Sequence, residues 1–239
     1  MSRTVRLSLI AGACILAVSI AVLLVKFPEK VPGGTVVPVP ESFTFFDLGA
    51  NTRFTNAIRN DLRERLGSDA VSYRGIIDLA FFDTSVMQAH FPTILDRHRA
   101  LNTPPGDRVE HDIVKLTYRY AWKRESPFKL IDLVFSNISG LPLYFVIGMT
   151  REGSYILAAL VEKYGEPQRF PGTQERQIIR CWEKNGDVLI VSEKPDRFGN
   201  PEYQVYIVFV NSIDQLIAHE RELAKRKEEK IRKAADKAF

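Results

Sequence analysis

An uncharged run near the N-terminus constrains this chain most. The nineteen residues from Leu7 to Val25 include no charged side chain. At ~1.5 Å of rise per residue, a helix of that length spans about the 30 Å hydrocarbon core of a bilayer. The run leads straight into Lys26, Phe27 and Pro28, without the small residues that a signal peptidase requires. The sequence therefore predicts a signal-anchor, a single uncleaved transmembrane helix within residues 1–26.

Two other interpretations of this run stay open. The first is a cleaved signal peptide. The second is lipidation at Cys14, because Ala11-Gly12-Ala13-Cys14 loosely matches a bacterial lipoprotein box, although only a short apolar run precedes it.

The flanking charges predict the orientation of the anchor. Arg3 and Arg6 precede it, whereas Lys26 and Lys30 follow it and are offset by Glu29. The positive-inside rule then favours a cytoplasmic N-terminus. In a bacterium, the rest of the chain would lie in the periplasm, held at the cytoplasmic (inner) membrane.

The composition indicates that the chain beyond this run forms one ordinary folded domain. The chain has 239 residues, of which 45% are hydrophobic and 26% charged, which excludes wholesale disorder and a polytopic membrane protein. Of the net charge of +4, residues 1–30 and 218–239 contribute +3 each, which leaves −2 for the middle. No nucleic-acid partner is expected, because such a partner needs a basic patch on the folded body.

Periodicity and turn residues divide the chain into four parts. Residues 27–42 contain four prolines and two glycines and predict an extended tether, 43–211 a globular domain, and 212–239 a charged helix. The predicted helices cover 47–66, 84–101 and 152–164, and the predicted strands cover 74–82, 114–123, 128–136, 141–149, 177–184, 187–193 and 203–210. This order predicts an α+β fold with a mostly antiparallel sheet packed with helices.

Two hairpins are specific enough to predict residue pairs. Asn185-Gly186 between apolar runs predicts a two-residue turn, because both residues tolerate positive φ. A four-residue loop between strands 114–123 and 128–136 would place Arg119 opposite Asp132 on the solvent face. The same register would point Tyr120 and Trp122 into the core.

A short internal similarity and the C-terminal segment complete the predicted fold. Residues 76–85 match 130–139 at five of ten positions, which we interpret as shared strand chemistry rather than a duplicated half.

Ser212 to Gln215 form a capping box that opens a helix reaching Lys237. Its mixed charges predict a solvated helix, and a partner-binding arm is the alternative.

One segment resembles a known unit. In Met149–Trp182, a predicted helix ends at Tyr164-Gly165-Glu166-Pro167 and a strand containing Trp182 follows. The segment resembles a unit of small exported bacterial proteins, including outer-membrane assembly lipoproteins of the SmpA/OmlA type. The lipoprotein cysteine box of that family is missing here, and the resemblance implies no binding residue.

Sequence motifs assign no catalytic, cofactor-binding or metal-binding residue. GxSxG, GxxxxGK[ST], GxGxxG, HExxH and CxxC are all missing from the sequence. Asp78 and Asp132 interrupt two predicted strands, and could share a proton as an acid/base pair if the strands were neighbours. His111, between Glu110 and Asp112, could serve as a base or a ligand, although a solvated strand end explains all three.

Three further residues have structural explanations. His90 and His98 share a predicted helix but lie ~12 Å apart along its axis, too far apart to hold one metal ion. Cys181 is a lone thiol in a predicted strand, where a small buried residue is expected.

The features combine into one expected function and two alternatives. An anchor, a tether and no catalytic motif indicate a single-pass, extracytoplasmic, non-enzymatic binding or assembly module, with lipid contacted through Leu7–Val25. A protein partner would bind the sheet or the C-terminal helix. The alternatives are an enzyme that uses Asp78, Asp132 or His111, and a cytosol-facing domain whose basic tail contacts lipid or nucleic acid.

Overall fold

The computed structural model describes residues 38–103, 109–151 and 153–238. The predicted anchor, Leu7–Val25, and most of the predicted tether lie outside these residues. Within the described ranges, every helix is too short or too polar to cross a bilayer.

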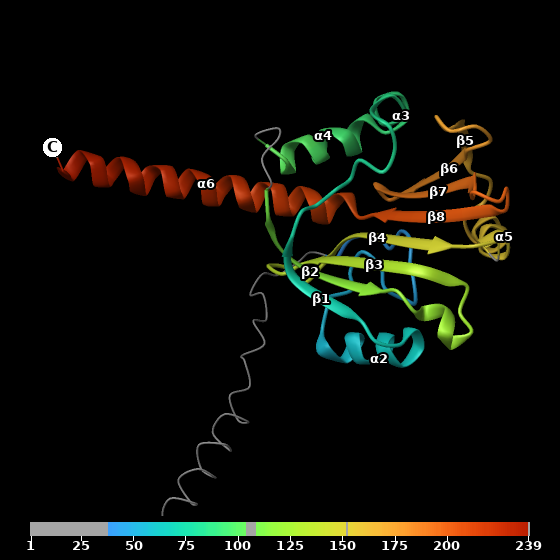
Figure 1. Cartoon of the computed structure of the whole chain (residues 1–239). Coiled ribbons are helices and arrows are strands. Elements are labelled where there is room, and N and C mark those ends of the chain that lie inside the picture. Colours follow the sequence, from blue (N-terminus) through green and yellow to red (C-terminus); the bar gives the residue numbers. More distant parts are fainter. Residues whose placement is uncertain (1–37, 104–108, 152, 239) are drawn as a thin grey trace, which may run out of the picture. The chain divides into compact units, whose positions relative to one another are not determined.

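The described residues form an α+β domain, as the sequence predicts (Figure 1). The helices are α2 (Asn56–Leu66), α3 (Thr84–His90), α4 (Pro92–Leu101), η1 (Ala121–Arg124, a 3-10 turn), α5 (Gly153–Tyr164) and α6 (Val210–Ala238). The strands are β1 (Ala70–Gly75), β2 (His111–Tyr118), β3 (Phe128–Ser136), β4 (Pro142–Met149), β5 (Gln168–Pro171), β6 (Ile178–Lys184), β7 (Asp187–Pro195) and β8 (Pro201–Val208).

The strands form one antiparallel sheet that contains an internal structural repeat. The order β1-β2-β3-β4-β8-β7-β6-β5 consists of two four-stranded meanders joined between β4 and β8 (Figure 1). A helix precedes each meander, α2 in the first half and α5 in the second, and each ends at a glycine with positive φ, Gly67 and Gly165. Because β4 and β8 are antiparallel, an approximate two-fold rotation normal to the sheet relates the halves.

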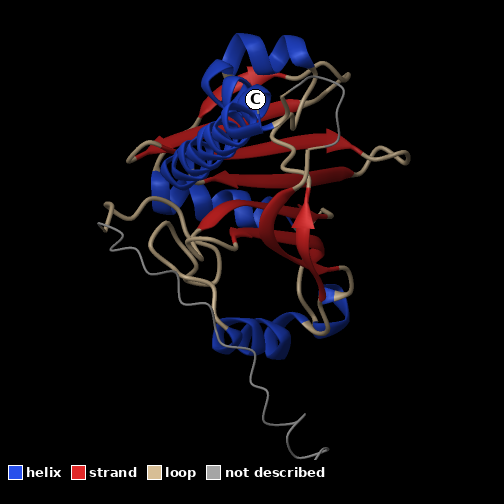
Figure 2. Ribbon diagram, turned by 90° about the vertical axis from the view of Figure 1, so that its left-hand side faces the viewer, coloured by secondary structure: helices blue, strands red, loops and turns tan. Residues whose placement is uncertain are grey.

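Helices cover both faces of the sheet, and each face has its own core (Figure 2). Residues of α2 and α5, such as Leu62 and Leu160, pack on one face against Ile131 and Phe145. Residues of α3, α4 and α6, such as Met87 and Ile213, pack on the other. The inserted pair α3–α4 and the added α6 therefore serve the second face alone.

The internal similarity noted in the sequence does not mark this repeat. Residues 76–85 lie in the connection from β1 to α3, whereas 130–139 include most of β3, whose counterpart in the second half is β7. Our interpretation that this match does not mark a duplicated half is therefore confirmed, although its attribution to shared strand chemistry is wrong for residues 76–82, which form a loop. The repeat that does exist was not predicted, because the two halves share their topology but not a readable sequence pattern.

The strand predicted over 74–82 is mostly a loop. β1 ends at Gly75, and the next residues run extended without a strand neighbour. Ile77 and Leu79 are nevertheless fully buried, whereas Ile76 and Asp78 are exposed. The alternation that predicted a strand is real, but it arises because the segment lies on the second core rather than in the sheet.

Two predicted helices begin or break elsewhere. The helix expected from Asp47 starts at Asn56, because Phe45 and Leu48 hydrogen-bond to each other in a turn and Thr55 caps the helix. The helix expected over 84–101 is broken at Phe91 into α3 and α4. Pro92 lacks the N–H that would continue the first helix and occupies the first turn of the second.

The predicted β2–β3 register is wrong by two residues. Thr117, not Arg119, pairs with Asp132, and Tyr118 pairs with Ile131. The chain leaves β2 after Tyr118 and forms η1, so the connection is longer than the four-residue loop we assumed. Trp122, predicted to be inside, is 58% exposed.

The second half follows the sequence closely. Lys184 pairs with Asp187, and Asn185 and Gly186 have φ of 53° and 86°, which confirms the predicted turn. α5 ends at Gly165, whose carbonyl accepts a hydrogen bond of 2.7 Å from the Trp182 indole N–H.

The start of α6 differs from the predicted capping box. The helix begins at Val210, before Ser212. The Val210 backbone N–H donates to Oδ1 of Asp187, 2.9 Å away, and the Ser42 hydroxyl donates to the other oxygen of the same carboxylate. Asp187 is buried, and burial raises its pKa although both hydrogen bonds lower it. The cap of α6 therefore comes from the β6–β7 hairpin, far away in the sequence.

Candidate functional site

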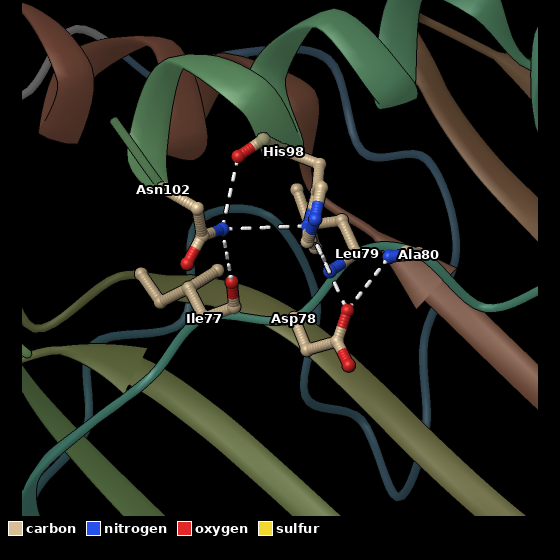
Figure 3. Close-up of polar contacts among 6 residues, drawn as sticks. All are labelled: Ile77, Asp78, Leu79, Ala80, His98 and Asn102. Carbon is tan, nitrogen blue, oxygen red and sulfur yellow. Dashed lines mark hydrogen bonds and ion pairs between the residues drawn. The ribbon is translucent and has the colours of Figure 1, made fainter. Parts of the chain in front are cut away.

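Asp78 and His98 lie side by side, and the contacts around them hold the backbone of the 76–82 loop (Figure 3). His98, in α4, accepts a hydrogen bond on Nδ1 from the Leu79 backbone N–H at 3.2 Å. Asn102, one turn further on, donates to the Ile77 carbonyl at 3.0 Å. These side chains satisfy backbone groups of the 76–82 loop that no strand satisfies.

This arrangement argues against an acid/base role for Asp78. Its Oδ1 is 3.6 Å from Nδ1 of His98, but that nitrogen already accepts from Leu79 and so has no proton to donate. The Asp78 carboxylate instead accepts from the Ala80 N–H at 2.9 Å, and its side chain is 70% exposed. The Asp78 carboxylate therefore stabilises a local turn in the 76–82 loop.

Asp132 has its own partners. It lies in β3, where the Lys115 ammonium is 2.7 Å from one carboxylate oxygen and the Thr117 hydroxyl donates to the other at 2.6 Å. Both Asp78 and Asp132 act electrostatically on Tyr144, whose pKa is raised mainly by burial. The structure thus places the two carboxylates around one tyrosine, each with separate partners.

His111 is buried, which contradicts the predicted solvated strand end. Its Nδ1 lies 2.7 Å from Oε1 of Glu220 in α6, and its Nε2 is buried without a hydrogen-bond partner among the described residues. The neighbouring Asp112 accepts from Asn137 at 2.7 Å on the exposed side. His111 therefore joins α6 to β2, opposite Gly75, the last residue of β1 before the 76–82 loop.

The remaining candidates are packing residues. His90 stacks on Phe170, with 4.2 Å between the ring centroids. Cys181 is buried, as expected, and burial raises its pKa to about 12. Across the described residues, no three His, Cys, Asp or Glu side chains gather in a way that could hold a metal ion.

A different surface gathers exposed aromatic and cationic side chains. We call it the loop end: the β2–β3 and β7–β8 connections, defined by Tyr120, Trp122, Lys123, Arg197 and Phe198. Tyr120 and Trp122 are 56% and 58% exposed, and Phe198 is 73% exposed. The Lys123 ammonium lies 4.8 Å from the Tyr120 ring centroid, and the Arg197 guanidinium lies 4.5 Å from that of Phe198.

The loop end also contains a hollow of about 740 Å³. Its lining includes Lys129, Lys194, Asp196, Arg197, Phe198 and Glu202. Glu202 pairs with Lys129 at 2.7 Å, and the Asp196 carboxylate accepts from two backbone N–H groups of its own turn. The acidic side chains are thus engaged, and the hollow offers cations beside an exposed ring.

The loop end and the entry of the chain lie at opposite ends of the sheet. β8 begins beside the β7–β8 hairpin and ends at α6, next to the turn at Asn185. The amide of Asn185 donates to the Glu41 carbonyl at 2.9 Å, so residues just before the body lie at the α6 end. Figure 1 shows α6 and α5 at these opposite ends.

The loop end was not predicted, because the alternating pattern places Tyr120 and Trp122 in a strand. The turn residues Asp196, Gly199, Asn200 and Pro201 were a usable signal for the β7–β8 hairpin. No family model, curated protein or solved structure matches this chain.

Proposed function

We propose that this protein is a single-pass, membrane-anchored, non-enzymatic binding or assembly module whose body lies outside the cytoplasm and binds a protein partner through the loop end. The anchor is Leu7–Val25. The observation that carries the proposal is the set of exposed aromatic rings with adjacent cations at one end of the sheet.

The composition of the loop end supports a protein partner. Trp, Tyr and Arg dominate the energetics of protein–protein interfaces, and the aromatic residues bury a large area with few rotatable bonds. Trp122, Tyr120 and Phe198 would each lose exposed apolar surface on binding. The loop end also lies opposite the end where the chain enters the body, so a tethered body can present it to a partner.

The catalytic candidates support a binding role. Asp78, Asp132 and His111 each have a partner that explains the residue: the Ala80 N–H, the Lys115 ammonium and the Glu220 carboxylate. The three share no hydrogen-bond or ion-pair partner among these contacts, which argues against a single site built from them.

Site-specific crosslinking tests the binding surface. A photoreactive phenylalanine analogue replaces Trp122 or Phe198 in the full chain in its native membrane, and irradiation should yield a discrete higher-mass adduct. Tyr73, in edge strand β1, is the matched control, because its exposure of 58% equals that of Trp122. No adduct from either loop-end position, or the same adduct from position 73, would refute the proposed surface.

Fusions test the anchor and its orientation separately. Alkaline phosphatase at the C-terminus should be active and a green fluorescent protein fusion dark, because the charges flanking Leu7–Val25 favour an outside body. N-terminal sequencing of the mature protein should still find residues before Leu7. A soluble mature species that begins near Phe27 would overturn the anchor.

A further inference from the structure

The C-terminal part of α6 leaves the body as an exposed helix, which we call the arm (residues 221–237). Glu220 is partly buried and pairs with His111 of β2. Every residue of the arm is exposed, and Figure 1 shows α6 running on beyond the sheet. At ~1.5 Å per residue, the arm is about 25 Å long.

The arm continues the apolar face with which α6 packs on the body. Ile213, Leu216 and Ile217 are buried against the second core. At 3.6 residues per turn, Leu223 and Ile231 fall on the same face of the helix, together with Ala224, Ala234 and Ala235. One cation, Lys227, lies among them, and its aliphatic stem can lie along the apolar surface while the ammonium reaches its edge. Leu223 is 50% and Ile231 60% exposed, so this face is uncovered along the arm.

Cations border this apolar face. Lys230 and Lys237 project along one side of it and Arg221 and Arg232 along the other. The arm contains eight Lys or Arg and four Asp or Glu, a net charge of +4. An apolar face bordered by long cationic side chains is the pattern of helices that lie in the interface of a bilayer.

We propose that the arm lies on the surface of an anionic phospholipid bilayer, with Leu223 and Ile231 toward the acyl chains and the bordering cations at the lipid phosphates. Two arms of a dimer would each bring a charge of +4, which disfavours a second copy as the occupant. A nucleic-acid backbone would leave the apolar face uncovered. A bilayer satisfies both features at once.

The position of the arm supports this occupant. Asp187 binds Ser42 and Val210 together, so the chain enters the body where α6 begins. This inference rests on the proposed anchor only to the extent that the anchor keeps a bilayer near that end. The contact itself depends on the arm's own residues.

Environment-sensitive labels on the full chain test the arm. With Cys14→Ser as background, a fluorophore is attached at Leu223→Cys, Ile231→Cys or, on the polar face, Glu229→Cys, and the protein is reconstituted with phosphatidylglycerol or with phosphatidylcholine. In phosphatidylglycerol, labels at 223 and 231 should shift to the blue and escape quenching by aqueous iodide, whereas the label at 229 should not. In phosphatidylcholine all three should remain quenched.

A charge variant sharpens the test. Lys230→Glu with Lys237→Glu lowers the net charge of the arm from +4 to zero and should abolish the shift. Lys225→Glu with Lys233→Glu, on the polar face, makes the same charge change. This variant should retain more of the blue shift of the labels at 223 and 231. Resistance of the protein to alkaline carbonate extraction measures separately whether the anchor is inserted in the membrane.

Three outcomes would overturn the inference. Labels at 223 and 231 that stay accessible in phosphatidylglycerol exclude the bilayer contact, even where carbonate extraction shows that the anchor holds. Protection that appears in detergent and grows with protein concentration identifies a second copy. Protection only in native membranes, and not in pure lipid, identifies a protein partner.

Discussion

Ser42 donates its hydroxyl hydrogen to the buried carboxylate of Asp187, 145 residues further along the chain. The other carboxylate oxygen accepts from the Val210 N–H at 2.9 Å. One side chain thus joins the segment that leads into the body, the β6–β7 hairpin and the start of α6. Asp187 and Ser42 are both buried, so water cannot readily replace these hydrogen bonds.

Asp187→Ala should destabilise the body by about 1–3 kcal/mol, because it leaves the Ser42 hydroxyl and the Val210 N–H without their acceptor. Asp187→Asn should cost less, since its amide oxygen can still accept from Val210. Denaturant unfolding of both variants measures the difference. Equal losses for Ala and Asn would show that the hydrogen bonds contribute little.

The carboxylate of Asp187 should also make the stability of the body depend on pH. Burial raises the pKa of Asp187 in the folded state above its unfolded value of about 3.9. A raised pKa contributes stability that is fully present below the unfolded value and lost as pH rises through the folded one. The stability of the wild type relative to Asp187→Asn should therefore fall as pH rises from about 4. An unchanged difference up to neutral pH would contradict the raised pKa.

His98→Ala should loosen the 76–82 loop. It removes the acceptor of the Leu79 N–H, 3.2 Å away, and should cost about 1 kcal/mol. Hydrogen exchange at the Leu79 amide should become faster. Asp78→Ala is the matched control, because its exposed carboxylate accepts from the Ala80 N–H and leaves the Leu79 N–H to His98. Faster exchange at Leu79 in the control, but not in His98→Ala, would overturn the assignment.

Gly153→Ala should destabilise the body despite the better helix propensity of alanine. An added Cβ would lie 2.5 Å from a carbon of the Tyr203 ring, which is closer than the van der Waals contact of two carbon atoms allows. Overpacking of this kind costs about 1–3 kcal/mol, whereas replacing glycine gains at most about 1 kcal/mol, a figure for helix interiors that is smaller at the first residue of α5. Thermal unfolding compares it with Ser154→Ala, an exposed position in the same turn, whose midpoint should hardly change. A midpoint for Gly153→Ala at or above the wild type would refute the predicted clash.

Cys181 should be inert to thiol reagents in the folded protein. Burial raises its pKa to about 12, so the reactive thiolate is scarce at neutral pH. A Cys14→Ser variant isolates this thiol for titration with a chromogenic disulfide. Reaction should be complete in denaturant and negligible without it. Rapid labelling under native conditions would contradict the buried position.

Asp132→Asn separates the binding module from the enzyme alternative. The variant loses a partly exposed ion pair with Lys115 and keeps an acceptor for Thr117, so we expect a loss of at most about 1 kcal/mol. Crosslinking from position 122 should be unchanged. A variant that abolishes biological function at unchanged stability would favour catalysis by Asp132.

Short-range features of the body could be predicted from the sequence. Asn185-Gly186 defines its turn because the two residues favour positive φ wherever they lie, and Gly165 ends α5 for the same reason. The α+β class, the β6–β7 pairing and the burial of Cys181 followed from such local preferences. The loop end could not be predicted, because alternation from Val114 to Trp122 continues past the last residue that pairs in β2.

Only the tertiary structure decided how distant segments meet. Joining β4 to β8 makes one sheet of two halves, and no local pattern encodes that choice, because any apolar strand can pair with another. The alternating residues Ile77 and Leu79 became a loop over the second core because His98 and Asn102 satisfy its backbone. The sequence by itself determined the turns and the periodicity, which act over a few residues. Packing and buried hydrogen bonds, such as that from Ser42 to Asp187, act between segments that become neighbours only when the chain folds.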